Sequence, residues 1–182
     1  GCGKSTLLNA AAGLLQPANG DVSIFGAPLT GLNAQAGYLF QQDALMPWKT
    51  ALENVAIGLE VAGIDPATAR DKAEHWLAQV GLQGFGARYP HQASGGQLQR
   101  AMAAMAMSCR PDILVLDEPT TALDVTTQIE VLILLKSLIH QYNTAALYIT
   151  HDLAVVAQVS DDIMVLRHGR QVEFGETAQI IH

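Results

Sequence analysis

The first six residues constrain the fold of this chain more than any other part of its sequence. They are Gly1, Cys2, Gly3, Lys4, Ser5 and Thr6. Glycines let backbone N–H groups approach a phosphate, and the start of a helix adds partial positive charge. Lys4 would contact the β- and γ-phosphates, and the Ser5 hydroxyl would bind Mg²⁺. The pattern predicts the second half of a phosphate-binding loop, against the alternative of a glycine-rich helix cap with an exposed lysine.

A short apolar run supplies the acidic partner that such a loop needs. Residues 113–116 read Ile-Leu-Val-Leu, and Asp117 and Glu118 follow. A continuous apolar run of this length predicts a strand buried on both faces. We expect Asp117 to hold Mg²⁺ through its water shell and Glu118 to polarise an attacking water. The alternative is that two acids merely end a strand before Pro119. The presence of the phosphate-binding loop motif in the same chain disfavours it.

A second glycine-rich motif precedes an apolar helical stripe. It consists of Ser94, Gly95, Gly96 and Gln97. Free N–H groups, glycines and a hydroxyl at a helix start predict a second anion site, although the same string alone would be an ordinary capped turn. Two anion sites are redundant in a simple nucleotide hydrolase. They make sense if the second site binds the nucleotide of another copy.

Apolar strand-like runs alternate with helical ones along the chain, which predicts an α/β fold with a mostly parallel sheet flanked by helices. We expect strands near residues 22–24, 37–40, 113–116, 145–149 and 163–166. The last two resemble 113–116 and are expected to be buried on both faces. We expect helices over 5–15, from Asp65-Pro66 to Gly81, and over 125–142. Residues from about 45 to 107 are rich in helical pattern and are expected to form an inserted helical subdomain.

The composition narrows the functional classes. A length of 182 residues predicts about one domain. Hydrophobic residues make up 49% and charged residues 15%, which excludes an intrinsically disordered chain. The net charge of −7 opposes a general nucleic-acid coat. Cys2 and Cys109 form no zinc or disulfide pattern, and no apolar run approaches the roughly 18 residues that suggest a membrane-spanning helix.

Taken in order, these motifs resemble those of the nucleotide-binding subunit of an ABC transporter. Residues 1–6 resemble its Walker A motif, 94–97 its signature and 113–118 its Walker B motif. The resemblance adds a Q-loop at Phe40-Gln41 and a D-loop at 121–124.

The resemblance also assigns roles to single residues. Gln41 would contact Mg²⁺ and the attacking water, and Glu118 would be the catalytic carboxylate. Asp124 of the D-loop is added to the nucleotide-binding set. His151 would be the switch histidine on the γ-phosphate, and it follows the expected strand 145–149 at the end where such sheets bind ligands.

The resemblance implies a P-loop NTPase, a single ABC ATPase domain over residues 1–182 with the helical subdomain at about 45–107. It implies ATP and Mg²⁺ as ligands and ATP hydrolysis that drives import. Implied partners are a second cassette, identical or not, transmembrane permease subunits and, indirectly, a periplasmic or extracellular substrate-binding protein, with no nucleic acid. The expected location is peripheral, on the cytoplasmic face of the inner membrane. The region from Gln41 to about Glu60 would dock the permease, with Trp48 either an anchor or a core residue.

Several features depart from the family pattern. The N-terminal strands and the adenine-stacking aromatic residue that precede the loop are absent, so we expect a truncated fragment of poor solubility. Ala93 replaces the usual leucine of the signature. Residues 39–48 resemble importers of nitrate, sulfonate and taurine, whereas 109–111, 119–126 and 151–156 resemble the oligopeptide, dipeptide and nickel branch.

Two other interpretations remain open on the sequence alone. A soluble ABC ATPase that acts on DNA or ribosomes is disfavoured by the acidic charge and by the lack of sustained heptads between Thr6 and Ser94. The second is a truncated, non-hydrolysing fragment that keeps its docking surfaces but cannot hold ATP. ATP binding discriminates between this fragment and the ATPase.

Overall fold

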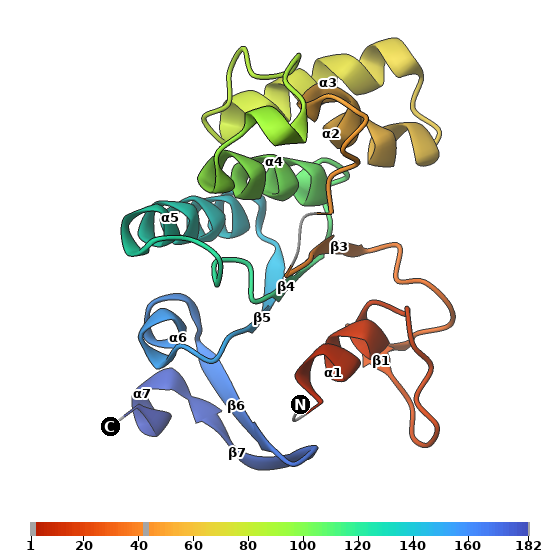
Figure 1. The fold of residues 1–182 in the computed structure, drawn as a ribbon. Coiled ribbons are helices and arrows are strands. Elements are labelled where there is room, and N and C mark those ends of the chain that lie inside the picture. Colours follow the sequence, from red (N-terminus) through yellow and green to blue (C-terminus); the bar gives the residue numbers. More distant parts are fainter. Residues whose placement is uncertain (1–2, 42–43, 182) are drawn as a thin grey trace.

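The computed structural model describes residues 3–41 and 44–181. At its centre lies a three-stranded parallel sheet in the order β3-β4-β5 (Figure 1). The strands are β3 (Ala36–Leu39), β4 (Ile113–Asp117) and β5 (Ala145–Ile149). The predicted strands at these places and the parallel sheet are therefore confirmed.

The register of the sheet brings three predicted site residues to one edge. Leu39 pairs with Leu116, and Asp117 pairs with Ile149. All three strands consequently end at nearly the same level, because parallel strands share a direction. The residues that follow these ends include Gln41, Glu118 and His151.

Helices cover the two faces of β4 differently. Leu114 and Leu116 belong to the large core cluster that includes residues of α4 (Gly95–Met107) and α5 (Val125–Tyr142). Val115 belongs to a second cluster with Leu8 of α1, which spans Lys4–Ala11. Successive side chains of a strand point to opposite faces, so α1 and the α4–α5 pair lie on opposite sides of the sheet (Figure 1).

The segment from about 45 to 107 contains helices and, among its described residues, no strand. Besides α4 it holds α2 (Ala51–Val61), α3 (Pro66–Gln79) and the short 3₁₀ helix η1 (Pro90–Gln92). Asp65 caps α3 by accepting the Thr68 N–H, and proline fits the first helical position. The apolar stripe predicted for α3 is buried in full, at Ala69, Ala73, Trp76, Leu77 and Val80.

The helix expected over 5–15 ends earlier, at Ala11. Gly13 adopts a left-handed φ of 71°, which stops the helix. A Cβ at this position would lie 2.0 Å from the carbonyl oxygen of Gly31. The close approach of the 31–33 segment, which the local pattern of Leu and Ala could not reveal, therefore sets this boundary.

The C-terminal region corrects a second expectation. Strand β6 (Asp162–Arg167) pairs only with β7 (Arg170–Glu176), in an antiparallel hairpin separate from the central sheet. Ile163 is buried, but Met164 and Val165 are 46% and 37% exposed, because a two-stranded sheet leaves its outer surface uncovered. In β5, likewise, the first two alanines are exposed. The prediction of burial on both faces was wrong for 163–166 and for the start of 145–149.

The remaining elements are short. A hairpin of β1 (Ser23–Ile24) and β2 (Ala27–Pro28) follows α1, while α6 (Leu153–Val159) and α7 (Thr177–Ile180) flank the C-terminal hairpin. Within the described ranges, no helix has both the length and the apolar character needed to cross a membrane.

Candidate active site

Glu118 lies at the centre of the candidate site. It follows β4 directly and has a positive φ of 47°, which is uncommon for a residue with a side chain. Its N–H donates a 3.0 Å hydrogen bond to the carbonyl oxygen of Ile149, the last residue of β5. The backbone therefore leaves the sheet abruptly at Glu118 and is held there by the neighbouring strand. Such unusual backbone conformations are concentrated at functional sites.

Four side chains from separate segments converge on the Glu118 carboxylate. Lys4 Nζ lies 3.4 Å from Oε1. Oε2 accepts hydrogen bonds from Gln41 Nε2 at 3.4 Å and from the Thr121 hydroxyl at 3.2 Å, and His151 Nδ1 lies 3.3 Å away. The fold thus joins the start of α1 to the segments that follow β3, β4 and β5. We call Glu118 with these four residues the carboxylate cluster.

Competing effects set the ionisation of Glu118. Burial alone raises its pKa, since the side chain is only 15% exposed. Hydrogen bonds from His151, Lys4 and Thr121, together with the charge of Lys4, outweigh burial and lower the pKa below its ordinary value. The group is therefore a carboxylate at neutral pH, ready to accept a hydrogen bond from a water.

The start of α1 presents unused backbone donors. Gly3 precedes the helix with a left-handed φ of 87°, and among the described residues no side chain caps the first turn. The N–H groups of Lys4, Ser5 and Thr6 are the donors that a helix start leaves without an intrahelical partner. This open first turn, with the Lys4 ammonium beside it, fits a phosphate group. The other two predicted loop residues, Gly1 and Cys2, lie outside the described residues.

Three oxygen-bearing side chains were predicted to hold Mg²⁺, namely Ser5, Gln41 and Asp117. Asp117 is the last residue of β4, is buried, and lies beside the β5 end at Ile149. No direct hydrogen bond joins Ser5 to Asp117, both of which are described. Hydroxyl, amide and carboxylate oxygens are ligands that Mg²⁺ accepts, so the donor set fits this ion.

The Ser94–Gln97 motif forms the start of α4. The Ser94 hydroxyl accepts the Gln97 N–H at 3.3 Å, and the Gln97 side chain accepts the Ser94 N–H at 2.9 Å. This reciprocal pair is a capping box. Among the described residues, no hydrogen bond joins residues 3–6 to residues 94–97. The motif is therefore a capped helix start outside the carboxylate cluster, and its role as a second anion site stays a prediction.

The two glycines of this motif also have a packing role that the sequence analysis missed. A Cβ at Gly96 would lie 2.5 Å from Thr127 Cγ2, and one at Gly95 would lie 3.2 Å from Leu123 Cδ2. The start of α4 thus packs closely against the segment that leads into α5. No local pattern signals this contact, because it depends on the distance between two helices.

Asp124 caps α5. Its carboxylate accepts the Thr127 N–H at 3.0 Å and the Thr127 hydroxyl at 2.7 Å, and these hydrogen bonds lower its pKa. The predicted contact of Asp124 with a nucleotide stays a prediction beside this structural role. Thr121, a carboxylate-cluster member, was not predicted as a site residue; its place three residues after Glu118 in a Pro-containing turn was the available signal.

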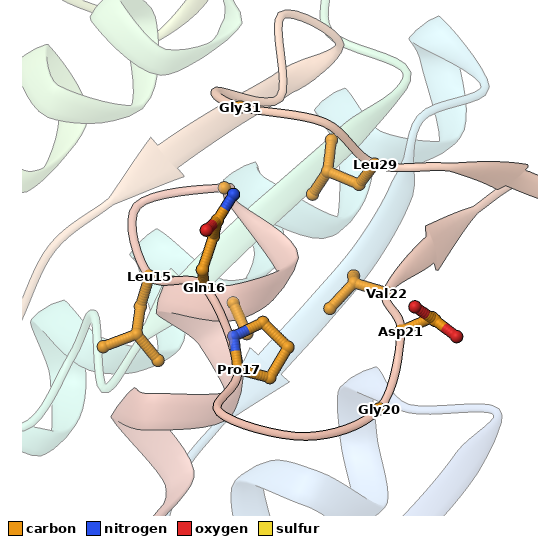
Figure 2. A pocket seen from close by; sticks show the side chains of 10 residues that line it. Leu15, Gln16, Pro17, Gly20, Asp21, Val22, Leu29 and Gly31 are labelled. Atoms are coloured by element: carbon orange, nitrogen blue, oxygen red, sulfur yellow. The ribbon is translucent and has the colours of Figure 1, made fainter.

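Trp48 and a surface pocket lie outside the carboxylate cluster. Trp48 is 73% exposed, so the alternative that it is a core residue is wrong. Figure 2 shows a pocket between the end of α1 and the β1–β2 hairpin, where Gln16, Pro17 and Val22 lie around the opening. Asp21 is its one charged lining residue, and none of the predicted site residues lines it. The pocket therefore contributes nothing to the carboxylate cluster.

Comparisons with known proteins agree with this geometry. Residues 1–121 match the family described as ABC transporter. The taurine import ATP-binding protein TauB of Pseudomonas aeruginosa is 43% identical over 91% of this chain and 63% of its own length. The Fe(3+) ions import ATP-binding protein FbpC of Rhizobium etli is 40% identical over 99% of this chain and 52% of its own length. The chain spans between 52% and 67% of the length of the curated relatives that it matches.

A solved structure is similar over nearly the whole chain. It is the dimeric post-hydrolysis state of the ATP-binding cassette MJ0796 bound to ADP and Pi, with a TM-score of 0.84 and 32% identity. The match covers 97% of this chain and 81% of that chain, which confirms the predicted fold of a P-loop NTPase. Motifs, fold and relatives agree: this chain belongs to the ABC transporter family.

Proposed function

We propose that this chain binds ATP with Mg²⁺ and hydrolyses the ATP to drive the import of a substrate through a membrane transporter. The observation that carries the proposal is the carboxylate cluster, in which four segments place polar groups on the Glu118 carboxylate. Relatives named as import ATP-binding proteins for taurine and for Fe(3+) support the importer role. Because those names differ in substrate, we propose that other subunits select the transported molecule.

The residues at the start of α1 would bind the nucleotide. The N–H groups of the first turn and the Lys4 ammonium would bind the phosphates, with Gly1, Cys2 and Gly3 allowing close approach of the backbone. Ser5, Gln41 and Asp117 would hold Mg²⁺, which when bound neutralises phosphate charge. Lys4 faces Glu118 in the structure, 3.4 Å away. Its movement toward a phosphate would free the carboxylate.

Glu118 would then act on the water that attacks the γ-phosphate. Its lowered pKa keeps it ionised, so the carboxylate can accept a hydrogen bond from an O–H of that water. Gln41 and His151 both contact Oε2 of Glu118. Gln41 would orient the water, and His151 would contact the γ-phosphate. These proposed roles are supported by the hydrogen-bond reach of both side chains to the Glu118 carboxylate.

The Ser94–Gln97 motif would bind the nucleotide of a second cassette. Its helix α4 packs on the face of the sheet opposite α1, and its polar groups contact only one another among the described residues. A related cassette forms a dimer in its post-hydrolysis state. We propose a similar pairing here, with Ser94, Gly95, Gly96, Gln97 and Asp124 facing the partner's nucleotide.

The membrane partners would bind elsewhere on the molecule. The region from Gln41 to about Glu60, with Trp48 exposed on its surface, would dock permease subunits on the cytoplasmic face of the inner membrane. A periplasmic or extracellular substrate-binding protein would act through those subunits. We propose no nucleic-acid partner, in keeping with the net charge of −7.

Hydrolysis by the full chain tests the proposal. Glu118→Gln removes the carboxylate with little change in shape, and we expect ATP hydrolysis to fall about 10²- to 10⁴-fold. Glu130→Gln is the matched control, since Glu130 is paired with Arg100 at 2.9 Å and lies outside the carboxylate cluster. The control should hydrolyse ATP at nearly the original rate. Undiminished hydrolysis by Glu118→Gln would contradict the proposed role of the carboxylate cluster.

A further inference from the structure

The loop that carries Trp48 has an unusual combination of exposure and order. Trp48 is 73% exposed, yet the loop around it, residues 46–50, is bonded to the helix that follows. Within the loop, the Lys49 N–H donates to the Met46 carbonyl at 3.1 Å and closes a turn around Trp48. The closed turn fixes the backbone position from which the exposed indole projects.

Asn54 holds this loop from inside the protein. It lies in α2 and is 0% exposed. Its side-chain oxygen accepts the Met46 N–H at 2.7 Å. Its side-chain nitrogen shares its two hydrogens among the carbonyls of Met46 at 3.2 Å, Lys49 at 3.1 Å and Thr50 at 2.9 Å. One buried amide therefore forms hydrogen bonds with backbone groups at both ends of the loop.

Further bonds fix the point where the loop enters α2. Thr50 and Glu53 form a capping box, in which the Glu53 carboxylate accepts the Thr50 N–H at 2.8 Å. The N–H groups of Ala51 and Leu52 donate to backbone carbonyls of Arg88 and Gly86. The first turn of α2 is thus fully bonded, and the loop has no freedom at its C-terminal end.

The chemistry of Asn54 makes the loop conformation specific. A primary amide buried beside the apolar residues Val55, Ala56 and Leu59 must have hydrogen-bond partners. The carbonyls and the N–H of this one loop conformation supply them. Any other arrangement of the loop would leave the buried amide and several backbone groups unpaired. Rigid display of an aromatic anchor lowers the cost of ordering it on binding.

We infer that Asn54 is a positioning residue that fixes the 46–50 loop and so presents Trp48 to the membrane-subunit partner. This inference rests on the proposed function for the identity of the partner. Asn54 itself is fully buried and would touch neither the partner nor a nucleotide. Its effect on the transporter would pass through Trp48 alone.

Fluorescence of Trp48 in the full chain tests the positioning directly. The other tryptophan, Trp76, is buried, so a Trp76→Phe background leaves Trp48 as the probe. We expect its anisotropy to decay with the tumbling of the whole protein. In Asn54→Asp, which loses both amide donors and places charge against three carbonyls, a nanosecond decay of large amplitude should appear.

Asn33→Asp is the matched control. Asn33 is also buried and also bridges backbone groups, donating to the Ala11 carbonyl and accepting the Gln35 N–H, but it lies outside the 46–50 loop. It should leave the Trp48 decay unchanged. A mobile Trp48 in the unsubstituted background, or an unchanged decay in Asn54→Asp, would overturn the inference. If Asn54→Asp does not fold, hydrogen exchange of the Met46 N–H in the unsubstituted chain tests the inference instead. Exchange as fast as in an open loop would show that Asn54 does not hold this N–H and would overturn the inference.

A double-mutant cycle separates positioning from a general structural role. The chain is reconstituted in lipid vesicles with the membrane subunits that co-purify with it, and their stimulation of ATP hydrolysis is measured. Trp48→Ala and Asn54→Asp should each reduce the stimulation about tenfold, and the double variant should be no worse than Trp48→Ala. Independent, multiplying losses would show that Asn54 does not act through Trp48. Absence of hydrolysis in the unsubstituted chain would refute the proposed function instead, and the fluorescence result would still decide the role of Asn54.

Discussion

The carboxylate cluster and the Ser94–Gln97 motif are built in contrasting ways. Glu118 contacts side chains from four separate segments, so the folding of one chain assembles the cluster. Among the described residues, the side chains of Ser94 and Gln97 form hydrogen bonds only with each other's N–H groups, in a capping box on the opposite side of the sheet from α1. The carboxylate cluster joins side chains that are distant in the sequence, whereas the Ser94–Gln97 motif is held together by local hydrogen bonds within one helix start. The difference underlies our proposal that the Ser94–Gln97 motif binds the nucleotide of a second cassette.

Substitutions at Lys4 and Ser94 should have the largest effects, and they should affect different quantities: ATP affinity at Lys4 and the rate of hydrolysis at Ser94. Lys4→Ala removes the ammonium beside the first turn of α1, and we expect ATP affinity to fall at least about tenfold. Ser94→Arg lies on the other side of the sheet and should keep ATP binding, while hydrolysis falls about 10²-fold or more because the second copy cannot close. Equilibrium binding of a fluorescent ATP analogue and steady-state hydrolysis measure the two effects. Loss of ATP binding in Ser94→Arg would mean that both motifs of one copy bind the same nucleotide, which contradicts the proposed pairing.

The packing of Gly96 against Thr127 yields a prediction of intermediate size. Gly96→Ala would bring a Cβ to 2.5 Å from Thr127 Cγ2, and the Thr127 rotamer is held by its hydrogen bond to Asp124. We expect the free energy of unfolding to fall by about 1–3 kcal/mol, measured by urea denaturation. Thr127→Ser removes that methyl group and keeps the hydroxyl, so the double variant should regain most of the loss.

Gly95→Ala is the matched control for this pair. Its Cβ would meet Leu123 Cδ2 at 3.2 Å, a milder contact with the end of a flexible side chain. The loss of stability should be smaller, and Thr127→Ser should not restore it. Equal rescue of both alanine variants would mean that the Gly96–Thr127 contact does not explain the effect.

The sequence predicted those parts of the fold that depend on local pattern. Helix α5 spans residues 125–142 as expected, because Asp124 provides a cap and the apolar periodicity continues up to Tyr142. His151 was predicted at the ligand-binding end of the sheet, since it closely follows the expected strand 145–149, and Glu118 was predicted to follow the buried strand 113–116. These features need only neighbouring residues and the common direction of parallel strands.

Features that depend on distant contacts could not be predicted in this way. The end of α1 at Ala11 is set by the backbone of residues 31–33. The pairing of β6 with β7 depends on a strand in which only Val172 and Phe174 alternate with polar residues, a signal too short to predict the strand. Asn54 is polar at a fully buried position, and its partners are backbone groups of a loop. A local pattern can signal a side chain that caps the start of its own helix, as at Asp65, but it contains no signal for a buried side chain that bonds to the backbone of a neighbouring loop.

The smallest expected effect concerns the pH dependence of the carboxylate cluster. Burial opposes ionisation of Glu118, but hydrogen bonds from His151, Lys4 and Thr121 prevail and lower its pKa. Because the pKa of Glu118 is lower in the folded state than in the unfolded state, its ionisation stabilises the fold at pH values above the unfolded-state pKa. This stabilisation is lost as the pH falls through the folded-state pKa. Thermal melts should therefore show a stability difference between the unsubstituted chain and Glu118→Gln of up to about 1 kcal/mol at neutral pH, shrinking in acid. A difference that grows in acid would reverse the assigned sign.

The mass of the Glu118→Gln chain in solution, with and without MgATP, tests the central claim most directly. The claim is that the carboxylate cluster acts on a nucleotide that the Ser94–Gln97 motif of a second copy completes. Sedimentation velocity should show a monomer without nucleotide and a dimer at saturating MgATP, because this variant binds ATP without consuming it. The same chain carrying Ser94→Arg should stay monomeric. A monomer at saturating MgATP in Glu118→Gln, with ATP binding verified in the same sample, would contradict the account.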